Sequence, residues 1–186
     1  MTQLVGRFEY PLFRFLLHVT GDAHAAEDLF QETFLRLHRA RGSYDPGQPL
    51  KPYLYRIALN AVRDARARNA AGAKAVSLDC PPPGNGNAAE VRETLAAPTP
   101  SPHEDCQREE TRAHVRAALE RLPDMEREVV LLRIFEGLTF AEIAQVTGAP
   151  VATAKSRMLY ALRRLRPVLE AYLSGRPSGL AKDAVS

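Results

Sequence analysis

The sequence lacks the features that mark secreted and membrane-spanning proteins. Its 186 residues contain only two cysteines, Cys80 and Cys106, too few for a disulfide framework and typical of a reducing compartment. The apolar stretch YPLFRFLLHV is short and is interrupted by Arg14, so it predicts neither a secretory signal nor a membrane-spanning helix. These absences predict a cytoplasmic protein with no direct membrane insertion.

Sequence patterns of catalytic centres are also missing. The chain has no glycine-rich phosphate loop, no His-Glu-x-x-His pattern and no carboxylate pair beyond ordinary helix surface. We therefore expect no catalytic residue, no cofactor and no enzymatic activity. His103, Cys106 and His114, with Cys80 farther away, raise the alternative of a zinc or redox site. Their uneven spacing favours scattered polar residues at the edge of a linker, so no metal site is predicted.

Charge is distributed unevenly along the chain. The net charge is only +3, but residues 51–68 contain five basic residues and one acid, and residues 155–166 contain five basic residues and no acid. Between these blocks, residues 77–110 contain seven acids and two bases. Two basic blocks separated by an acidic stretch predict two contacts with a polyanion.

Proline marks a boundary in the middle of the chain. Six of the 14 prolines lie between residues 70 and 105, a density that sustains neither a helix nor a central strand. On either side, apolar residues recur at helical spacing, and no stretch alternates as a strand would. The sequence therefore predicts an all-α fold of two small helical domains, residues 1–70 and 111–172, joined by a flexible Pro/Gly-rich acidic linker over 71–110. Residues 173–186 are expected to form a disordered tail.

A helix-turn-helix is predicted at the second basic block. Thr139 and Glu142 fit a capping box at the start of a short helix, and Gly148 permits a turn with positive φ. The next helix is expected from about Pro150. Its packing side comprises Val151, Ala154, Met158, Ala161, Leu162 and Leu165. Its opposite side carries hydroxyl and guanidinium groups suited to base edges and phosphates in a major groove. A solvated basic face is the alternative, and the cap and turn favour DNA binding.

Two faces in the first half are less specific. Arg56, Asn60 and Arg63 share one side of a helix that starts near Tyr53, which suits unpaired bases. Taken alone, this pattern favours a solvated face, with the tyrosines packing as half-buried core. An earlier helix, expected to be capped by Asp22, has an apolar stripe at Ala26, Leu29, Phe30, Thr33, Phe34 and Leu37. Its other side is acidic and could meet a basic protein surface. From physics alone, a solvated face with a Glu32–Arg36 pair is the favoured interpretation.

Together these stretches resemble bacterial RNA polymerase sigma factors of the extracytoplasmic-function (ECF) type. AEDLFQETFLRLHR is similar to the family's core-binding segment, and YLYRIALNAVRDARAR to its minus-ten segment. LERLPDMEREVVLLRIFEGLTFAEIAQVTGAPVATAKSRMLYALRRLR resembles its minus-thirty-five domain. The resemblance covers roughly residues 8–70 and 111–170. The chain has no tryptophan, and Tyr53 stands where the family commonly has one.

The resemblance implies three contact sets and several partners. Core RNA polymerase, through its large-subunit clamp helices and flap, would be met mainly by Asp28, Gln31, Glu32, Phe34 and Arg36. The opened minus-ten strand would be held by Tyr53, Arg56, Asn60 and Arg63. The minus-thirty-five duplex would be contacted by Thr153, Lys155, Ser156, Arg157, Tyr160, Arg163 and Arg164. The resemblance also implies an anti-sigma factor as a partner.

Other functions compete with this one. A stand-alone helix-turn-helix regulator would bind DNA without polymerase, but it has no need of an acidic face at Asp28 and Glu32. An enzyme acting on DNA, such as a recombinase or nuclease, needs the catalytic groups that the sequence lacks. The sequence thus favours a sigma factor that directs promoter recognition, DNA melting and transcription initiation.

Overall fold

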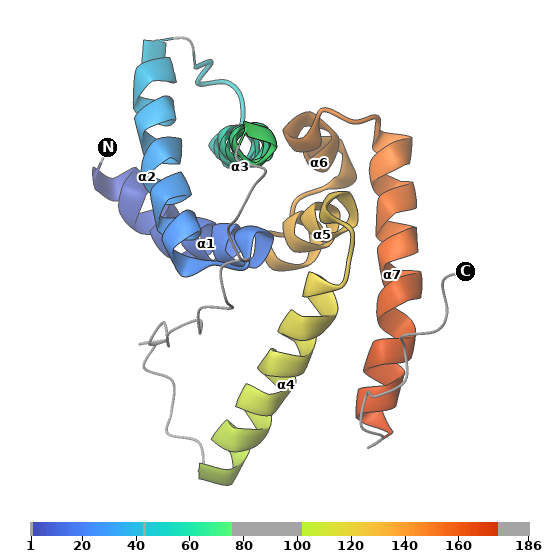
Figure 1. The fold of residues 1–186 in the computed structure, drawn as a ribbon. Helices are drawn as coiled ribbons and strands as arrows, with labels where there is room; N and C mark the ends of the chain where they lie inside the picture. Colours follow the sequence, from blue (N-terminus) through green and yellow to red (C-terminus); the bar gives the residue numbers. More distant parts are fainter. Residues whose placement is uncertain (1, 43, 76–101, 175–186) are drawn as a thin grey trace.

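The structure is a computed structural model that describes residues 2–42, 44–75 and 102–174. Its first half holds α1 (Thr2–Thr20), α2 (Ala23–Arg39), the 3₁₀ turn η1 (Ala40–Gly42) and α3 (Leu50–Ala75). Its second half holds α4 (Pro102–Glu120), α5 (Asp124–Val130), the π-helical turn η2 (Leu131–Phe135), α6 (Phe140–Thr147) and α7 (Val151–Leu173). Figure 1 shows these helices. Within the described ranges there is no strand, and the all-α prediction is confirmed.

The start of α2 follows its local sequence. Gly21 takes a positive φ of 73°, which ends α1 and reverses the chain. The Asp22 carboxylate accepts a hydrogen bond from the amide of Ala25 at 2.8 Å, so the predicted N-cap is confirmed. Ala26, Leu29 and Thr33 are buried along the predicted apolar stripe, and the Phe30, Phe34 and Leu37 side chains pack half-buried beside them.

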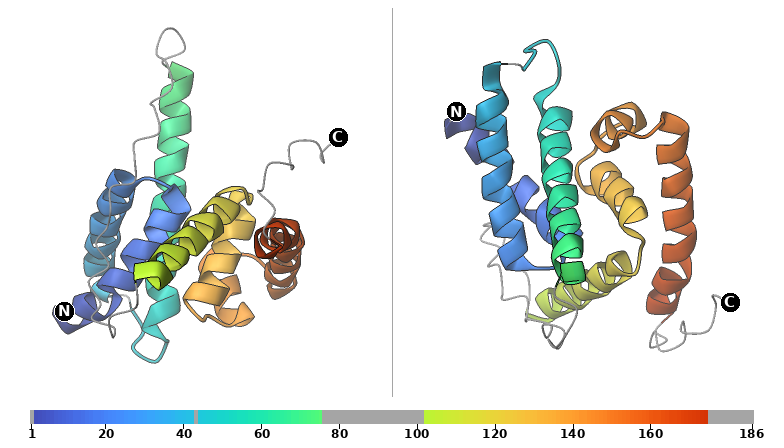
Figure 2. Two further views of the ribbon diagram at one scale, coloured as in Figure 1. Left: turned by 90° about the horizontal axis from the view of Figure 1, so that it is seen from below. Right: turned by 45° about the horizontal axis from the view of Figure 1, so that its top comes forward.

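Helices extend into both ends of the segment expected to be a linker. α3 continues to Ala75 rather than ending near residue 68, because its last turns are rich in alanine and arginine, which favour helix. α4 begins at Pro102, where a missing amide proton costs nothing in the first turn. Residues 76–101 and 175–186, the remainder of the expected linker and most of the expected tail, lie outside the described residues. In the left view of Figure 2 the green end of α3 projects beyond the neighbouring helices.

The helix-turn-helix is formed by α6 and α7. The Thr139 hydroxyl accepts from the Glu142 amide at 3.3 Å, and a Glu142 carboxylate oxygen accepts from the Thr139 amide at 2.7 Å. This confirms the capping box. Gly148 ends α6 with φ 71°, a conformation that costs glycine little. Pro150 precedes α7 as its N-cap rather than starting it.

One part of the predicted packing side of α7 is wrong. Ala154, Met158, Ala161 and Leu165 are buried, but Val151 and Leu162 are 40% and 49% exposed. At 100° per residue these two lie at the edge of the apolar stripe, beyond the part that α5 and α6 cover. Their exposure leaves apolar surface on α7.

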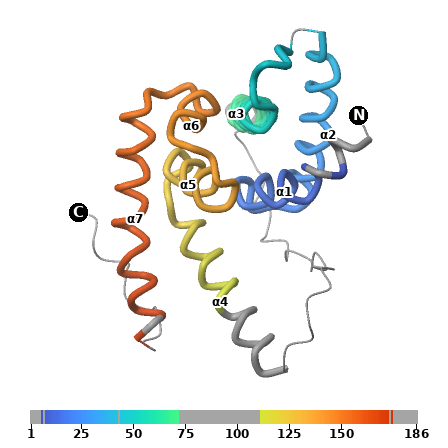
Figure 3. Tube along the Cα trace, turned by 180° about the vertical axis from the view of Figure 1, so that it is seen from behind, coloured from blue at the N-terminus to red at the C-terminus, as the bar shows by residue number. Residues whose placement is uncertain are grey.

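The two halves pack against each other. α3 contacts α6, and α1 contacts α4 and α5, so the halves share a long junction. Figure 3 shows α3 beside α6, with α1 reaching toward α5. Buried apolar side chains of both halves form one cluster, which includes Leu12, Phe15, Leu54, Leu59, Leu131 and Ile143. Among the described helices, none is long and apolar enough to cross a membrane.

Candidate nucleic-acid and protein interfaces

α7 lies at the edge of the molecule (Figure 1) and carries the predicted duplex-binding residues. Thr153 and Arg157 are half-buried, and the other predicted duplex-binding residues are exposed: Lys155, Ser156, Tyr160, Arg163 and Arg164. The Ser156 hydroxyl donates to the Ala152 carbonyl at 2.9 Å, which orients it along the helix. The structure therefore brings the whole predicted duplex-binding set onto one accessible helix.

Arg164 of α7 forms an ion pair with another helix of the second half. Its Nε lies 3.2 Å from a carboxylate oxygen of Glu126, which is on α5. The pair joins α7 to α5 and holds the Arg164 guanidinium close to the second half. To contact a phosphate, the Arg164 guanidinium would have to leave the Glu126 carboxylate or contact both groups at once.

An aromatic pair stands at the start of α3. The ring of Tyr53 lies 5.0 Å from the ring of Tyr44, and the Arg56 guanidinium lies 5.3 Å above the Tyr53 ring. The Tyr44 hydroxyl donates to the Gln48 carbonyl at 2.6 Å, which ties the preceding loop to this pair. Arg56 and Asn60 are exposed farther along the same face. Tyr44 was not among the predicted site residues, although its aromatic ring could have indicated it.

Arg63, the last member of the predicted single-strand set, turns toward the second half. Its Nη2 donates to a Glu128 carboxylate oxygen at 3.1 Å, and its Nη1 donates to the Thr147 carbonyl at 3.2 Å. Its Nε is buried and has no hydrogen-bond partner among the described residues. Arg63 lies at the edge of the face that carries Arg56 and Asn60, so α5 can reach it.

Glu128 is the buried centre of this contact. It is only 2% exposed, and Arg66 approaches its second oxygen at 3.8 Å. Burial raises the pKa of Glu128, and the nearby Arg63 guanidinium opposes that rise. Arg66 also pairs with Asp124 at 2.9 Å and donates to the Val19 carbonyl at 3.0 Å. Arginines of α3 thus face carboxylates of α5.

A second polar contact joins α3 to the end of η2. The π-helical turn ends with the Glu136 amide donating to the Leu131 carbonyl at 3.1 Å, and Glu136 is buried there. The buried Tyr55 hydroxyl donates to its carboxylate. Lys51 Nζ lies 3.2 Å from the same carboxylate and donates to the Glu136 carbonyl at 2.5 Å. Burial, followed by the Glu136 carboxylate, raises the pKa of Tyr55 well above the usual range.

The predicted polymerase-binding face lies on α2. Asp28 and Gln31 are exposed, and Phe34 is half-buried with its ring 4.9 Å from that of Phe30. A shallow hollow is lined by Phe30, Gln31, Phe34 and Leu35. The Leu35 side chain is 51% exposed, so this face combines carboxylates with accessible apolar surface.

Glu32 and Arg36 form the expected intrahelical pair. Arg36 Nε donates to Glu32 at 2.7 Å, and Arg36 Nη1 donates to Asp64 of α3 at 2.6 Å. The hydrogen bond from Arg36 lowers the pKa of the Glu32 carboxyl. These bonds fix Arg36 between two helices and leave Asp28 as the more accessible acid of the face.

No cluster of three metal-ligating side chains is found among the residues that the structure describes. The exposed His114 ring lies 4.5 Å from the ring of Tyr172, so it packs against α7. Cys80 and the side chains of His103 and Cys106 lie outside the described part of the chain.

Comparison with known proteins identifies the family. Residues 4–71 match sigma-70 region 2, and residues 112–165 match sigma-70, region 4. The ECF RNA polymerase sigma factor EcfG of Rhodopseudomonas palustris is 32% identical over 167 residues, covering 87% of this chain and 79% of the relative. The chain belongs to the ECF sigma factors. Sigma factor CarQ of Myxococcus xanthus is 33% identical over 155 residues, covering 83% of this chain and 80% of that protein.

Two solved structures share the fold. The sigma factor RpoE of Bartonella quintana, solved with the anti-sigma factor NepR, superposes with a TM-score of 0.66 at 22% identity, covering 91% of this chain and 96% of that chain. CnrH, solved with the cytosolic domain of CnrY, gives a TM-score of 0.62 at 25% identity, with coverage of 91% and 87%. The two family-model matches and the curated relatives confirm the predicted family, and this sigma factor directs promoter-specific transcription.

Proposed function

We propose that this sigma factor acts through three separate surfaces, each on a different helix. The observation that carries the proposal is their chemistry: α2 is acidic and apolar, the start of α3 is aromatic and cationic, and α7 is cationic and hydroxyl-rich. One polyanion cannot account for all three, because an acidic face repels DNA. A polymerase subunit together with duplex and single-stranded promoter DNA can account for all three surfaces.

The α7 surface is proposed to read duplex DNA. Arg157 and the exposed Ser156 and Tyr160 lie on successive turns and would meet base edges in the major groove. Lys155, Arg163 and Arg164 would contact flanking phosphates, which set the position of the helix without reading sequence. Release of Arg164 from Glu126 would accompany this contact.

The start of α3 is proposed to hold the opened promoter strand. The Tyr44–Tyr53 pair and the Arg56 guanidinium offer flat surfaces on which an unstacked base can lie. Asn60 would hydrogen-bond a base edge, and Arg63 would meet the strand backbone. Stacking contributes about 1–3 kcal/mol per base, enough to offset the few kcal/mol of unpairing a base.

The α2 face is proposed to bind core polymerase, on the clamp helices of its large subunit. Asp28 and Glu32 would meet basic groups, with Gln31, Phe34 and Arg36 completing the contact. The flap is the proposed site for the second half. Exposed Leu35 adds apolar area that a protein partner can cover and a nucleic acid would not.

An anti-sigma factor is a further proposed partner. The sigma factor RpoE of Bartonella quintana, whose fold matches this one, was solved with the anti-sigma factor NepR. The proposed role is non-enzymatic, and it places the protein in the cytoplasm, where polymerase and chromosome lie.

Transcription reconstituted with core polymerase and fragmented genomic DNA tests this function. We expect RNA with discrete 5′ ends that share upstream sequence, and no such RNA from core enzyme alone. Discrete binding of the free protein to duplex DNA, without any stimulation of core polymerase, would instead indicate a stand-alone regulator.

A further inference from the structure

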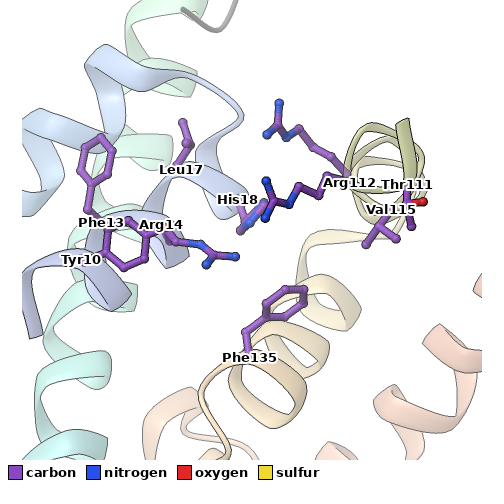
Figure 4. Close-up of a pocket in the computed structure, with 10 residues that line it drawn as sticks. Tyr10, Phe13, Arg14, Leu17, His18, Thr111, Arg112, Val115 and Phe135 are labelled. Carbon is purple, nitrogen blue, oxygen red and sulfur yellow. The ribbon is translucent and has the colours of Figure 1, made fainter. Parts of the chain in front are cut away.

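A groove of about 230 Å³ lies between α1 of the first half and α4 of the second half. Its apolar walls come from three elements: Phe13 and Leu17 of α1, Val115 of α4 and Phe135 of the π-helical turn η2. Figure 4 shows these side chains around the space. The residues that line the groove belong to none of the three proposed contact surfaces, so the proposed function does not account for the groove.

A second hollow adjoins the groove. It has a volume of about 150 Å³ and shares Tyr10, Arg14, His18 and Phe135 with the groove, and it reaches the buried Phe15 side chain. The two spaces therefore follow one another along α1. Each is smaller than the roughly 300–1,000 Å³ that is usual for the site of a drug-sized ligand. Their arrangement suits a slender aliphatic chain better than a nucleotide or another bulky ligand.

Cations line the groove beside its apolar walls. Arg14 of α1 and Arg112 and Arg116 of α4 are among its lining residues, and Figure 4 shows Arg14 and Arg112 reaching into the space. Burial first, and then Arg14 and Arg116, lower the pKa of His18, so both guanidinium groups lie close to this imidazole. No carboxylate is found among the described residues that line the groove. An anion would offset this concentration of positive charge.

The adjoining hollow does contain an acid, Glu136. Its carboxylate accepts a hydrogen bond from the Tyr55 hydroxyl and lies 3.2 Å from Lys51 Nζ. Lys51 balances the charge of Glu136, so the arginines of the groove still favour an added anion. Guanidinium groups match carboxylates through pairs of parallel hydrogen bonds, which makes a carboxylate a suitable head group.

We propose that the groove binds a linear aliphatic carboxylate, that is, a fatty acid. Arg14 and Arg116 would donate hydrogen bonds to its head group beside His18. Its chain would lie between α1 and α4 against Phe135 and Val115, with the chain end in the adjoining hollow. Because the ligand contacts both halves, its binding would stabilise their packing. This inference goes beyond the proposed function and does not depend on it.

Isothermal titration calorimetry of the full chain with three amphiphiles tests the chemistry of the site. Decanoate has the proposed head group and chain, octanoate has a shorter chain, and decyltrimethylammonium has a cationic head group on the longer chain. All are used below micelle-forming concentrations. Each buried methylene group contributes about fourfold in affinity, so decanoate should bind about 15-fold more tightly than octanoate. Decyltrimethylammonium should not bind, because the arginines repel it.

Arg116→Gln tests the contact with the head group. Arg116 is exposed, so removal of its charge should weaken decanoate binding about fivefold, which is the scale of an exposed ion pair. Arg121→Gln is the matched control, since Arg121 is also exposed but does not line the groove. It should bind decanoate as the natural protein does.

A tryptophan reporter tests the location of the ligand. The chain has no tryptophan, so Phe135→Trp introduces a single indole, at a position that lines the groove. Its emission should shift to shorter wavelength with decanoate, because the aliphatic chain displaces water from the ring. Tyr160→Trp places the same reporter at an exposed position on α7, and its emission should not change. Circular dichroism verifies that each variant is folded.

Several results would overturn the proposal. Absence of decanoate binding would do so, and would leave an acidic amphipathic protein segment as the occupant that fits the groove. Equal affinities for octanoate and decanoate would show that the chain is not buried. Equal effects of Arg116→Gln and Arg121→Gln, or an emission shift in Tyr160→Trp as well, would show that binding is not in the groove. If Phe135→Trp fails to fold, the comparison of the two arginine variants still decides the location.

Discussion

The contact between Tyr55 and Glu136 predicts a specific coupling between the two halves of the chain. Both side chains are buried, and the hydroxyl donates to a carboxylate that also pairs with Lys51. Hydrogen bonds to charged groups contribute about 1.5–3 kcal/mol. Tyr55→Phe leaves the Lys51 contact in place, so it should cost about 2 kcal/mol of the free energy of unfolding. For a chain of this length that corresponds to a decrease of about 4–8 °C in Tm.

A double-mutant cycle isolates this bond. Tyr55→Phe, Glu136→Ala and the double variant are unfolded by urea, with circular dichroism as the signal. Glu136→Ala also removes the Lys51 contact, but it does so in the single and the double variant alike, so this loss cancels from the coupling energy. We expect a coupling energy of about 1.5–3 kcal/mol. Tyr53→Phe, which removes a hydroxyl from a half-buried ring on the same helix, is the control and should change stability by less than about 0.5 kcal/mol.

The same cycle can refute the closed arrangement. If the halves are apart in solution, the Tyr55 hydroxyl and Glu136 carboxylate are each hydrated. Their coupling energy would then fall below about 0.5 kcal/mol, as it does for distant residues. Such a result would contradict the packing of α3 against the second half.

Three further predictions concern the other surfaces and pH. Arg157→Ala should weaken binding to the upstream promoter duplex by about 1–3 kcal/mol, measured by anisotropy, and unchanged affinity would remove Arg157 from the recognition surface. Asn60→Ala should reduce open complexes, detected by permanganate footprinting, more than closed complexes; equal losses would count against strand capture. Because the folded-state pKa of Tyr55 is raised, its contribution to stability is complete below about pH 10, the usual phenol range, and is lost at higher pH. In an absorbance titration Tyr55, identified by comparison with Tyr55→Phe, should therefore stay un-ionised above the usual phenol range, and its ionisation within that range would contradict its burial.

Local sequence signals predicted the local structure well. The Asp22 cap, the Thr139–Glu142 capping box and the Gly148 turn each depend on residues within a few positions of one another, and all three are present. Helical periodicity also placed the buried side of α2 correctly. It was wrong for Leu162 because periodicity locates a stripe but not how far neighbouring helices cover it.

The polar contacts between α3 and the second half could not be predicted in this way. Their partners are far apart in the sequence, and no rule of spacing connects Arg63 with Glu128 or Tyr55 with Glu136. Arg63 was predicted to bind single-stranded DNA from its position on the helix alone. That prediction did not include its contacts with Glu128 and Thr147 of the second half. The ends of the expected linker were also misjudged, since the alanine-rich end of α3 and the proline at the start of α4 are both compatible with helix.

Binding to core RNA polymerase tests the central claim most directly. The purified protein is mixed with bacterial core polymerase and analysed by size-exclusion chromatography, alongside a variant with Asp28→Ala and Glu32→Ala. A control with Glu9→Ala and Glu120→Ala removes two exposed acids outside the α2 face. We predict that the natural protein and the control co-elute with polymerase and that the α2 variant, folded by circular dichroism, does not. Absence of co-elution for the natural protein would contradict the proposed action as a polymerase subunit, and co-elution of all three would contradict the α2 interface.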